Sequence, residues 1–347
     1  MRRRFDDTDS AISALRDGTT RIIAGALPFD HSNRCALIEP SAVSRNSPLP
    51  GRTPATRGTL RIRSSEPTPD EHARRVGKAV AMIRSGELEK VVLARRLVLE
   101  STVPIDPIDV LDRLVRRDHA SNGYLVDLST SHTAGPVLVG SSPEVLIRRS
   151  GRTVSCFPLA GSAPRSSDPL KDRAHARMLR GSGKDLREHA FVVDSVRAAL
   201  AELCVNLQIP AGPDVIATPQ MWHLGTAISG ELRDPELTAL DLARQMHPTP
   251  AVCGTPRTAA QGAIADIEGD RGLYAGAVGW CDAAGDGEWM VTIRCAEISA
   301  DGRTLVAFAG GGIVADSDPT QELAETTAKF GTILDALDAR GLERRRA

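Results

Sequence analysis

The 347-residue sequence lacks several features that mark particular classes of protein. Its net charge is −1 with a pI near 6.7, so bulk electrostatics do not predict nucleic acid or an anionic membrane as a partner. The basic residues 1–4 are not followed by the apolar region of a signal peptide, and no apolar run is long enough to span a membrane. We therefore expect a soluble cytoplasmic protein.

Cysteine is present, but not at the spacing of a metal site or a redox motif. The chain has no C-x-x-C pair and no His/Cys cluster of zinc spacing. We expect the cysteines to be reduced and mostly buried, as small apolar residues. They are Cys35, Cys156, Cys204, Cys253, Cys281 and Cys295.

Lysine is scarce. The sequence has 5 Lys against 38 Arg, a bias typical of genome composition, so most positions that tolerate either cation have become Arg. A retained lysine is therefore a candidate for chemistry that needs a compact, deprotonatable amine. The five are Lys78, Lys90, Lys171, Lys184 and Lys329.

Two charged segments lie where helices normally carry packing residues. Residues 182–190 (SGKDLREHA) open a long helical pattern and carry Glu188, and residues 321–329 (QELAETTAK) place Glu322 and Glu325 on one stripe. Carboxylates from separate helices repel unless a cation lies between them, and hard oxygen ligands suit Mg²⁺. The alternative is that both segments are solvated helix faces.

Periodicity and turn residues predict mixed helices and strands. Helices are expected at 70–84, 109–117, 169–180, 184–204, 259–267 and 319–339. Strands are expected at 21–29, 34–38, 90–99, 124–128, 137–139, 145–148, 222–232, 273–281, 288–298 and 303–309. Loops are expected at 40–59, 157–165 and 246–257. The last three strands predict an antiparallel meander, and hence an α+β rather than a doubly wound fold. There are no repeats and no strong linker.

Several single residues are candidates for a site. Lys90 begins a strand on a face that a fold can bury; the alternative is a charge that guards a strand edge. Glu144 follows Pro143 at the start of a strand, as a turn residue or a pocket acid. Gly161 and Ser162 lie in a Pro/Gly-rich loop that can bring backbone N–H groups close to an anion.

Other candidates are unusual for their surroundings. His223 lies in a strand-like segment, where a lone histidine is more often a satisfied core group than a catalyst. Arg294 lies among apolar strand residues and needs an anionic partner if it is buried. Tyr274 is one of only two tyrosines. The glycines around Gly311 precede the final helix and are a weak signal by themselves.

Eight long motifs follow one another along the chain: EKVVLARR, GSSPEVLIRR, PLAGSAPR, SGKDLREHAFVV, HPTPAVCGTPR, EGDRGLYAGAVGW, IRCAEI and AGGGIVADSDPTQELAETTAK. In this order they resemble the chorismate-utilising enzymes, the family of isochorismate synthase, salicylate synthase, anthranilate synthase component I and aminodeoxychorismate synthase component I. The similarity covers most of the chain and is densest from residue 89 to residue 329. GALPFD, which contains Phe29, resembles the amino-terminal segment of isochorismate synthases.

The resemblance implies a fold, a substrate and a cofactor. The expected fold is one large α+β domain over residues 1–347, with two mostly antiparallel sheets packed as a sandwich and helices outside. Residues 1–60 would form amino-terminal strands and a surface loop, and residues 61–340 the main catalytic part. Chorismate is the implied substrate, Mg²⁺ the cofactor, and a monomer the implied state.

The resemblance also assigns roles position by position. It implies that Glu188 and Glu325 carry Mg²⁺, that Lys90 activates water and that Glu144 is the general acid. The substrate-binding residues it implies are Gly161, Ser162, His223, Ala251, Tyr274, Arg294, Gly311 and Lys329, with Tyr274 and Arg294 holding a substrate carboxylate.

The site residues favour one reaction in the family. Ala160 replaces the nucleophilic lysine of one type of aminodeoxychorismate synthase. Anthranilate synthases receive ammonia from a partner subunit, lack the lysine base and bear an L-L-E-S motif, which is missing here. Salicylate synthases carry a threonine where this chain has Ala251.

We therefore expect an isochorismate synthase without a glutaminase subunit. Water would add at C2 of chorismate while the C4 hydroxyl leaves, with Lys90 as a neutral base and Glu144 as an acid whose pKa burial raises. Salicylate synthase is the first alternative, followed by anthranilate or aminodeoxychorismate synthase component I, and a chorismate binder without catalysis is the least favoured. The sequence leaves open the pathway that the product feeds and the role of Glu322.

Overall fold

The structure is a computed structural model that describes residues 3–44, 58–117, 122–130 and 133–339. Most of the loop expected at 40–59 lies outside these residues. The helices in the described part of the chain are α1 (Thr8–Arg16), α2 (Pro69–Arg84), α3 (Pro107–Arg117), α4 (Pro169–Gly181), α5 (Gly183–Leu203), α6 (Ala239–Met246), α7 (Arg257–Glu268) and α8 (Pro319–Ala336).

Strands of the described residues pair into three sheets, and each pairing is antiparallel. The nine-stranded sheet has the order β1 (Arg4–Phe5), β3 (Ala36–Ile38), β2 (Ile22–Leu27), β16 (Ala277–Asp282), β17 (Gly287–Val291), β8 (Val145–Ser150), β9 (Thr153–Phe157), β14 (Ile228–Leu232) and β11 (Cys204–Gln208). The seven-stranded sheet has the order β15 (Gly254–Thr255), β5 (Lys90–Ser101), β19 (Thr304–Ile313), β18 (Cys295–Ile298), β7 (Val137–Ser141) and β6 (Gly123–Asp127), with β4 (Leu60–Glu66) also paired to β5. The three-stranded sheet has the order β10 (Leu159–Pro164), β13 (Met221–Gly225) and β12 (Asp214–Ala217).

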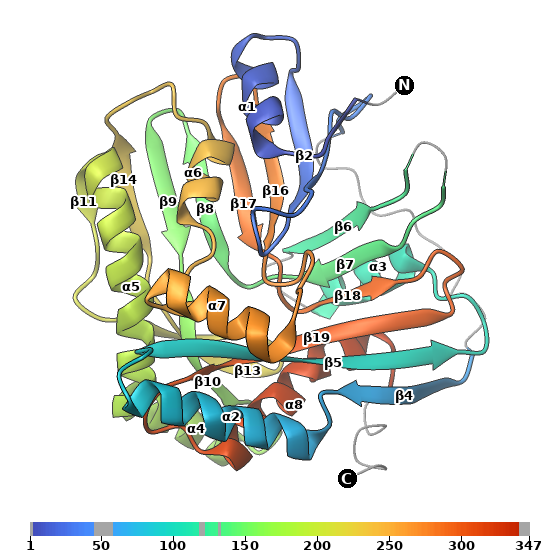
Figure 1. Ribbon diagram of the computed structural model, residues 1–347, viewed down its shortest axis with the longest axis vertical. Coiled ribbons are helices and arrows are strands. Elements are labelled where there is room, and N and C mark those ends of the chain that lie inside the picture. Colours follow the sequence, from blue (N-terminus) through green and yellow to red (C-terminus); the bar gives the residue numbers. More distant parts are fainter. Residues whose placement is uncertain (1–2, 45–57, 118–121, 131–132, 340–347) are drawn as a thin grey trace.

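The two large sheets share one apolar core. Buried side chains of the nine-stranded sheet, such as Ile147 and Trp289, belong to the same cluster as Leu93 and Ile313 of the seven-stranded sheet. Figure 1 shows the strands of the first sheet running along the long axis and those of the second running across it, with α1, α2 and α5 outside. The predicted α+β class with two main antiparallel sheets is confirmed, and the small third sheet is an addition to it.

The segment at 157–165 was predicted as a loop, and this prediction is wrong. Its residues form the end of β9 and all of β10, which pairs with β13. Gly161 has φ +78°, and the pairing register with β13 shifts between Leu159 and Ser162. The glycine therefore lies in a β-bulge within the strand and not in a loop. Ser162 then lies opposite His223 on β13.

Two predicted strands are each divided between sheets. Residues 222–232 form most of β13 in the small sheet and then β14 in the nine-stranded sheet. Residues 288–298 form β17 and then β18, again in different sheets, so the predicted three-strand meander is wrong. The second break lies at Arg294, whose φ of +53° is incompatible with a continuous strand. Arg294 therefore joins two strands instead of lying within one.

The triple glycine also differs from expectation. Gly310, Gly311 and Gly312 do not lie between β19 and α8 but inside β19, opposite Ala94, Leu93 and Val92 of β5. The sequence pattern also gave no prediction for α1, α6, β4, β9, β11 and β12. By contrast, α2, α5, α8 and β5 occupy nearly the predicted residues.

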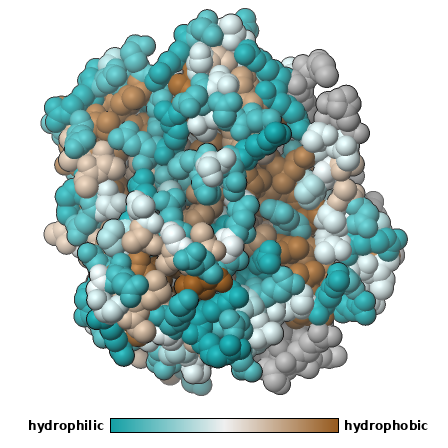
Figure 2. Space-filling model, in the orientation of Figure 1, coloured by the Kyte–Doolittle hydropathy of each residue, from teal (hydrophilic) through white to brown (hydrophobic). Residues whose placement is uncertain are grey.

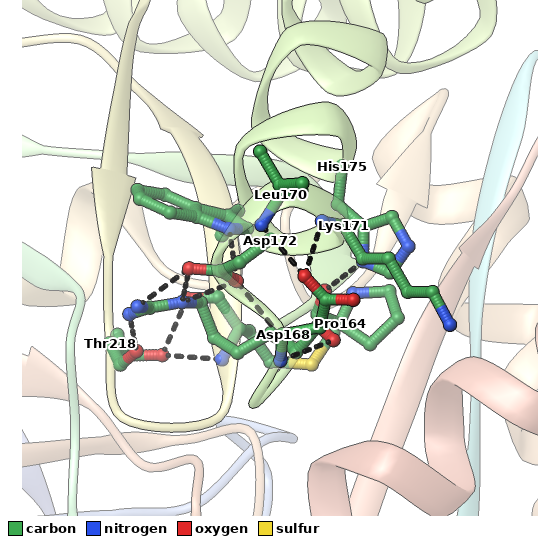
Figure 3. Close-up of polar contacts among 11 residues, drawn as sticks. Pro164, Asp168, Leu170, Lys171, Asp172, His175 and Thr218 are labelled. Carbon is green, nitrogen blue, oxygen red and sulfur yellow. Dashed lines mark hydrogen bonds and ion pairs between the residues drawn. The ribbon is translucent and has the colours of Figure 1, made fainter.

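A polar network fastens β10 to helix α4 (Figure 3). Arg165 donates hydrogen bonds to both carboxylate oxygens of Asp172, and Trp222 Nε1 donates to one of them at 3.0 Å. Asp168 caps the helix by accepting from the backbone N–H of Leu170 at 2.8 Å. These contacts fix the strand that carries Gly161 and Ser162.

The surface shown in Figure 2 is mostly hydrophilic, with apolar residues in small patches. Within the described ranges, the large apolar side chains that stay exposed are Val43, Leu170, Met178 and Leu186. A search of the same residues finds no helix with the length and apolar character to cross a membrane.

Candidate active site

Two helices bring three carboxylates to the middle of the molecule, where each binds a lysine. Glu188 comes from α5, and Glu322 and Glu325 come from α8, so the pairing of these two charged segments is confirmed. The ion pairs, measured from Nζ to Oε1, are Lys90–Glu188 at 3.3 Å, Lys184–Glu322 at 2.6 Å and Lys329–Glu325 at 2.6 Å. Three of the five lysines therefore lie here, and the interpretation of both segments as solvated faces is wrong.

The glycines of β19 make room for these carboxylates. A Cβ atom on Gly312 would lie 1.9 Å from Glu188 Oε1, and one on Gly311 would lie 3.3 Å from Glu322 Oε2. The strand conformation is open to any residue here, so the glycines are required by space and not by backbone angle. The weak glycine signal thus marks the point where the acids of α5 and α8 approach the sheet.

Lys90 is a fully buried residue and not an edge charge. Its side chain is 0% exposed, and β5 is covered by β15 and β4 on one side and by β19 on the other. Its Nζ contacts Glu188 but makes no hydrogen bond within the described residues. The alternative of a gatekeeper charge is therefore excluded.

Glu144 is a buried acid at the start of β8. Its side chain is 3% exposed, and burial raises its pKa to about 8. A hydrogen bond from the backbone at Leu159 and the positive charges of Lys90, Arg294 and Lys329 oppose this rise without cancelling it. Glu144 is thus a pocket acid, and near neutral pH it holds a proton that it can donate.

Arg294 and His223 meet across the junction of the sheets. Arg294 Nη2 lies 3.5 Å from His223 Nε2. Burial, and then the charges of Arg294 and Lys329, lower the pKa of His223, so this imidazole is neutral. Burial also lowers the pKa of Arg294, which the negative charges of Glu325 and Glu144 counteract. Glu325, which Lys329 keeps ionised, is therefore the acid whose negative charge offsets that of Arg294, although no ion pair joins the two among the described residues.

Glu325 and Glu322 are neighbours with different environments. Burial disfavours the charge of Glu325, but Lys329 holds its pKa below the ordinary value, and Ser162 Oγ donates to it at 3.0 Å. Burial and the charge of Glu325 raise the pKa of Glu322 to about 7. Its Oε1 accepts from Lys184 and from Ser317 Oγ, whereas Oε2 has no hydrogen-bond partner in the described chain.

One cavity joins most of the predicted residues. Its lining includes Glu144, Gly161, Ser162, Glu188, His223, Ala251, Tyr274, Arg294, Glu325 and Lys329. Lys90 binds the lining residue Glu188, and Gly311 lies in β19 between the lining residues Gly310 and Gly312. His223 is therefore a cavity residue and not only a core group.

Some residues of the site were missed. Lys184 lies four residues before Glu188 on α5, but it binds Glu322 on α8. Its rarity as a lysine was the signal that could have identified it. Ser317 donates a hydrogen bond to Glu322, and Phe308 lines the cavity. Neither residue had a sequence pattern that marked it as part of the site.

A metal site is not preformed by protein atoms alone. The residues covered by the structure hold no group of three or more His, Cys, Asp or Glu side chains arranged to bind an ion. The carboxylates instead face lysine ammonium groups. An incoming cation would have to replace these lysines as the counter-ions.

The α+β fold and the cavity that gathers these residues agree with the family that the sequence motifs resemble, the chorismate-utilising enzymes. The family model described as "chorismate binding enzyme" matches residues 37–338. The chain belongs to this family. The family that the sequence motifs indicated is therefore confirmed.

Within this family, the chain is similar to proteins named isochorismate synthase. Isochorismate synthase DhbC of Bacillus subtilis is 46% identical over 334 residues, 93% of this chain and 83% of that protein. The DhbC crystal structure from Bacillus anthracis is 39% identical, with a TM-score of 0.87 over 98% of this chain and 92% of that one. The menaquinone-specific isochorismate synthase MenF of Escherichia coli has a TM-score of 0.79 at 25% identity, covering 96% of this chain and 84% of that one.

Proposed function

We propose that this chain is an isochorismate synthase, which converts chorismate to isochorismate. The observation that carries the proposal is the single cavity lined by buried Glu144, by Glu325 and by Glu188, with Lys90 bound to the last. Relatives named isochorismate synthase, similar over most of both chains, support the same reaction.

The proposed reaction needs a base and an acid. Lys90, as the neutral amine, takes a proton from water as its oxygen bonds to C2 of chorismate. The ring double bond shifts, the C4–O bond breaks, and Glu144 gives its proton to the departing hydroxyl, which leaves as water. One water is added and one is lost, so the change is an isomerisation. Each proton transfer typically contributes ~10²–10⁴-fold to the rate.

The other cavity residues would hold the substrate. Tyr274 and Arg294 would bind one carboxylate, and Arg294 is suited to this because a buried guanidinium needs an anion. Lys329, with the backbone at Gly161 and Gly311, would complete the pocket. His223 is neutral, so it can accept or donate a hydrogen bond without adding charge.

We infer that Mg²⁺ is the cofactor, held by Glu188 and Glu325. The donor set fits a hard cation, because the site offers carboxylate oxygens and the buried Oε2 of Glu322 has no hydrogen-bond partner in the described ranges. When bound, the ion would neutralise and orient a substrate carboxylate. The lysines that now pair with these acids would then no longer be their counter-ions.

We further infer that residues 1–347 act as one catalytic domain, as a monomer and without a glutaminase subunit. Incubation of the purified chain with chorismate and Mg²⁺, followed by separation of the products, tests the proposal. Isochorismate alone is the expected product. Salicylate with pyruvate would indicate a salicylate synthase instead, and an aminated product formed with ammonia would indicate a synthase subunit.

A further inference from the structure

Phe308 covers one face of the Tyr274 ring. The two rings are stacked, with centroids 4.9 Å apart and an angle of 12° between their planes. Phe308 comes from β19 and Tyr274 from the segment between α7 and β16, so elements far apart in the sequence make the pair. Both side chains are less than 10% exposed. Packing therefore restricts the plane of the tyrosine ring.

Within the described part of the chain, the Tyr274 hydroxyl is positioned by the packing of its ring and not by a hydrogen bond. Among the described residues, no hydrogen bond is made to the hydroxyl of Tyr274. The hydroxyl lies over Gly310, where a Cβ atom would be 2.8 Å from it. The carbonyl of Gly310 accepts a hydrogen bond from Lys329 Nζ at 2.8 Å. The Tyr274 hydroxyl and the Lys329 ammonium group thus both lie close to Gly310, but of these two only Lys329 forms a hydrogen bond to it.

The stacked pair is also a wall between two cavities. On its far side lies a cavity of about 350 Å³ between β4, the start of α2 and the turn after α7. Of the residues that line it, Tyr274 and Phe308 alone also line the catalytic cavity. Removal of the Phe308 ring would join the two spaces and free the tyrosine ring to turn into the outer one.

We propose that Phe308 is the positioning residue for Tyr274. Its ring holds the Tyr274 hydroxyl toward Gly310 and Lys329, where the substrate carboxylate binds, and keeps water of the outer cavity away from that contact. This proposal rests on the proposed function for the role of Tyr274. Because Phe308 acts only through Tyr274, it contributes to binding the substrate and the transition state alike, and not to the proton transfers.

A double-mutant cycle with chorismate tests this role. Phe308→Leu should raise the chorismate KM about 2- to 12-fold, the range expected for loss of one aromatic pair. Its kcat should stay within about twofold, because the acid and the base are untouched. Tyr274→Phe should raise KM by itself, and the Phe308→Leu/Tyr274→Phe double variant should be no worse than Tyr274→Phe. Phe5→Leu, a buried phenylalanine of β1, is the matched control and should leave KM unchanged.

The outcomes are distinct. Independent effects that multiply in the double variant, or an unchanged KM in Phe308→Leu, would overturn the proposal. If Phe308→Leu does not fold, as judged by its melting temperature, Phe308→Met keeps the volume without the flat ring and takes its place in the cycle. Calorimetric titration with chorismate repeats the cycle on binding alone. It therefore remains informative even if the wild-type chain forms no isochorismate, a result that would reject the proposed function and not this inference.

Discussion

Lys184 binds Glu322 across two helices, with 2.6 Å between Nζ and Oε1, and not Glu188 one turn along its own helix. The pair leaves Oε2 of Glu322 buried beside Gly311, without a hydrogen-bond partner among the residues that the structure describes. An acid in this position can support the cation that we propose for Glu188 and Glu325, either directly or through water. Its role, which the sequence left open, becomes testable.

Glu322→Gln should weaken Mg²⁺ binding about 10- to 100-fold, as expected when a group next to the metal ligands is lost. Glu325→Ala should weaken it further, because a ligand itself is removed. Calorimetric titration of the metal, together with the Mg²⁺ dependence of turnover, measures both effects. Glu202→Gln, an exposed acid of α5, is the control. An unchanged metal titration in Glu325→Ala would mean that these carboxylates are structural.

Gly312→Ala should abolish most activity without unfolding the protein. The new methyl group would lie 1.9 Å from Glu188 Oε1, so the carboxylate must move away from the cavity. A catalytic group displaced by about 1 Å can cost about 10²-fold in kcat/KM. In contrast, Gly77→Ala meets no atom within 4 Å in α2 and should stabilise the fold by about 1 kcal/mol. Steady-state kinetics and thermal unfolding distinguish the two; full activity in Gly312→Ala would refute the crowding argument.

Glu144 should impose an alkaline limit on the reaction. Burial raises its pKa to about 8, and a general acid works only while protonated. The wild-type kcat/KM should therefore be independent of this group well below pH 8 and fall as the pH rises through it. Glu144→Gln should lose ~10²–10⁴-fold and should not show that decline. Glu231→Gln, an exposed acid of β14, should keep the wild-type profile. A wild-type profile that stays flat through this range would remove Glu144 from the role of acid.

Lys90→Ala should lose turnover by at least ~10²-fold, because Lys90 is the lysine that forms an ion pair with Glu188 among the described residues. The variant should still bind chorismate in a calorimetric titration, since Arg294 and Tyr274 remain. Lys78→Ala, an exposed lysine of α2, controls for the loss of a positive charge. Near-normal turnover in Lys90→Ala would show that the base lies elsewhere.

The local parts of the fold were predictable because their signals are local. Helix α8 has a proline at its first position and Asp318 as its cap, and strand β5 is a mostly apolar segment with three valines. The breaks were not predictable. Arg294 sits between apolar residues that suit either sheet, so only the pairing of β17 with β8 and of β18 with β7 decides where one strand ends.

The sequence by itself determined the family, most of the candidate residues that the cavity brings together and most of the elements that carry them, because motifs and periodicity are properties of contiguous residues. Only the tertiary structure decided which lysine meets which carboxylate, why β19 carries three glycines, and that Phe308 covers Tyr274. These are contacts between segments far apart in the chain, and their distances follow from how the two large sheets and the helices α5 and α8 pack together.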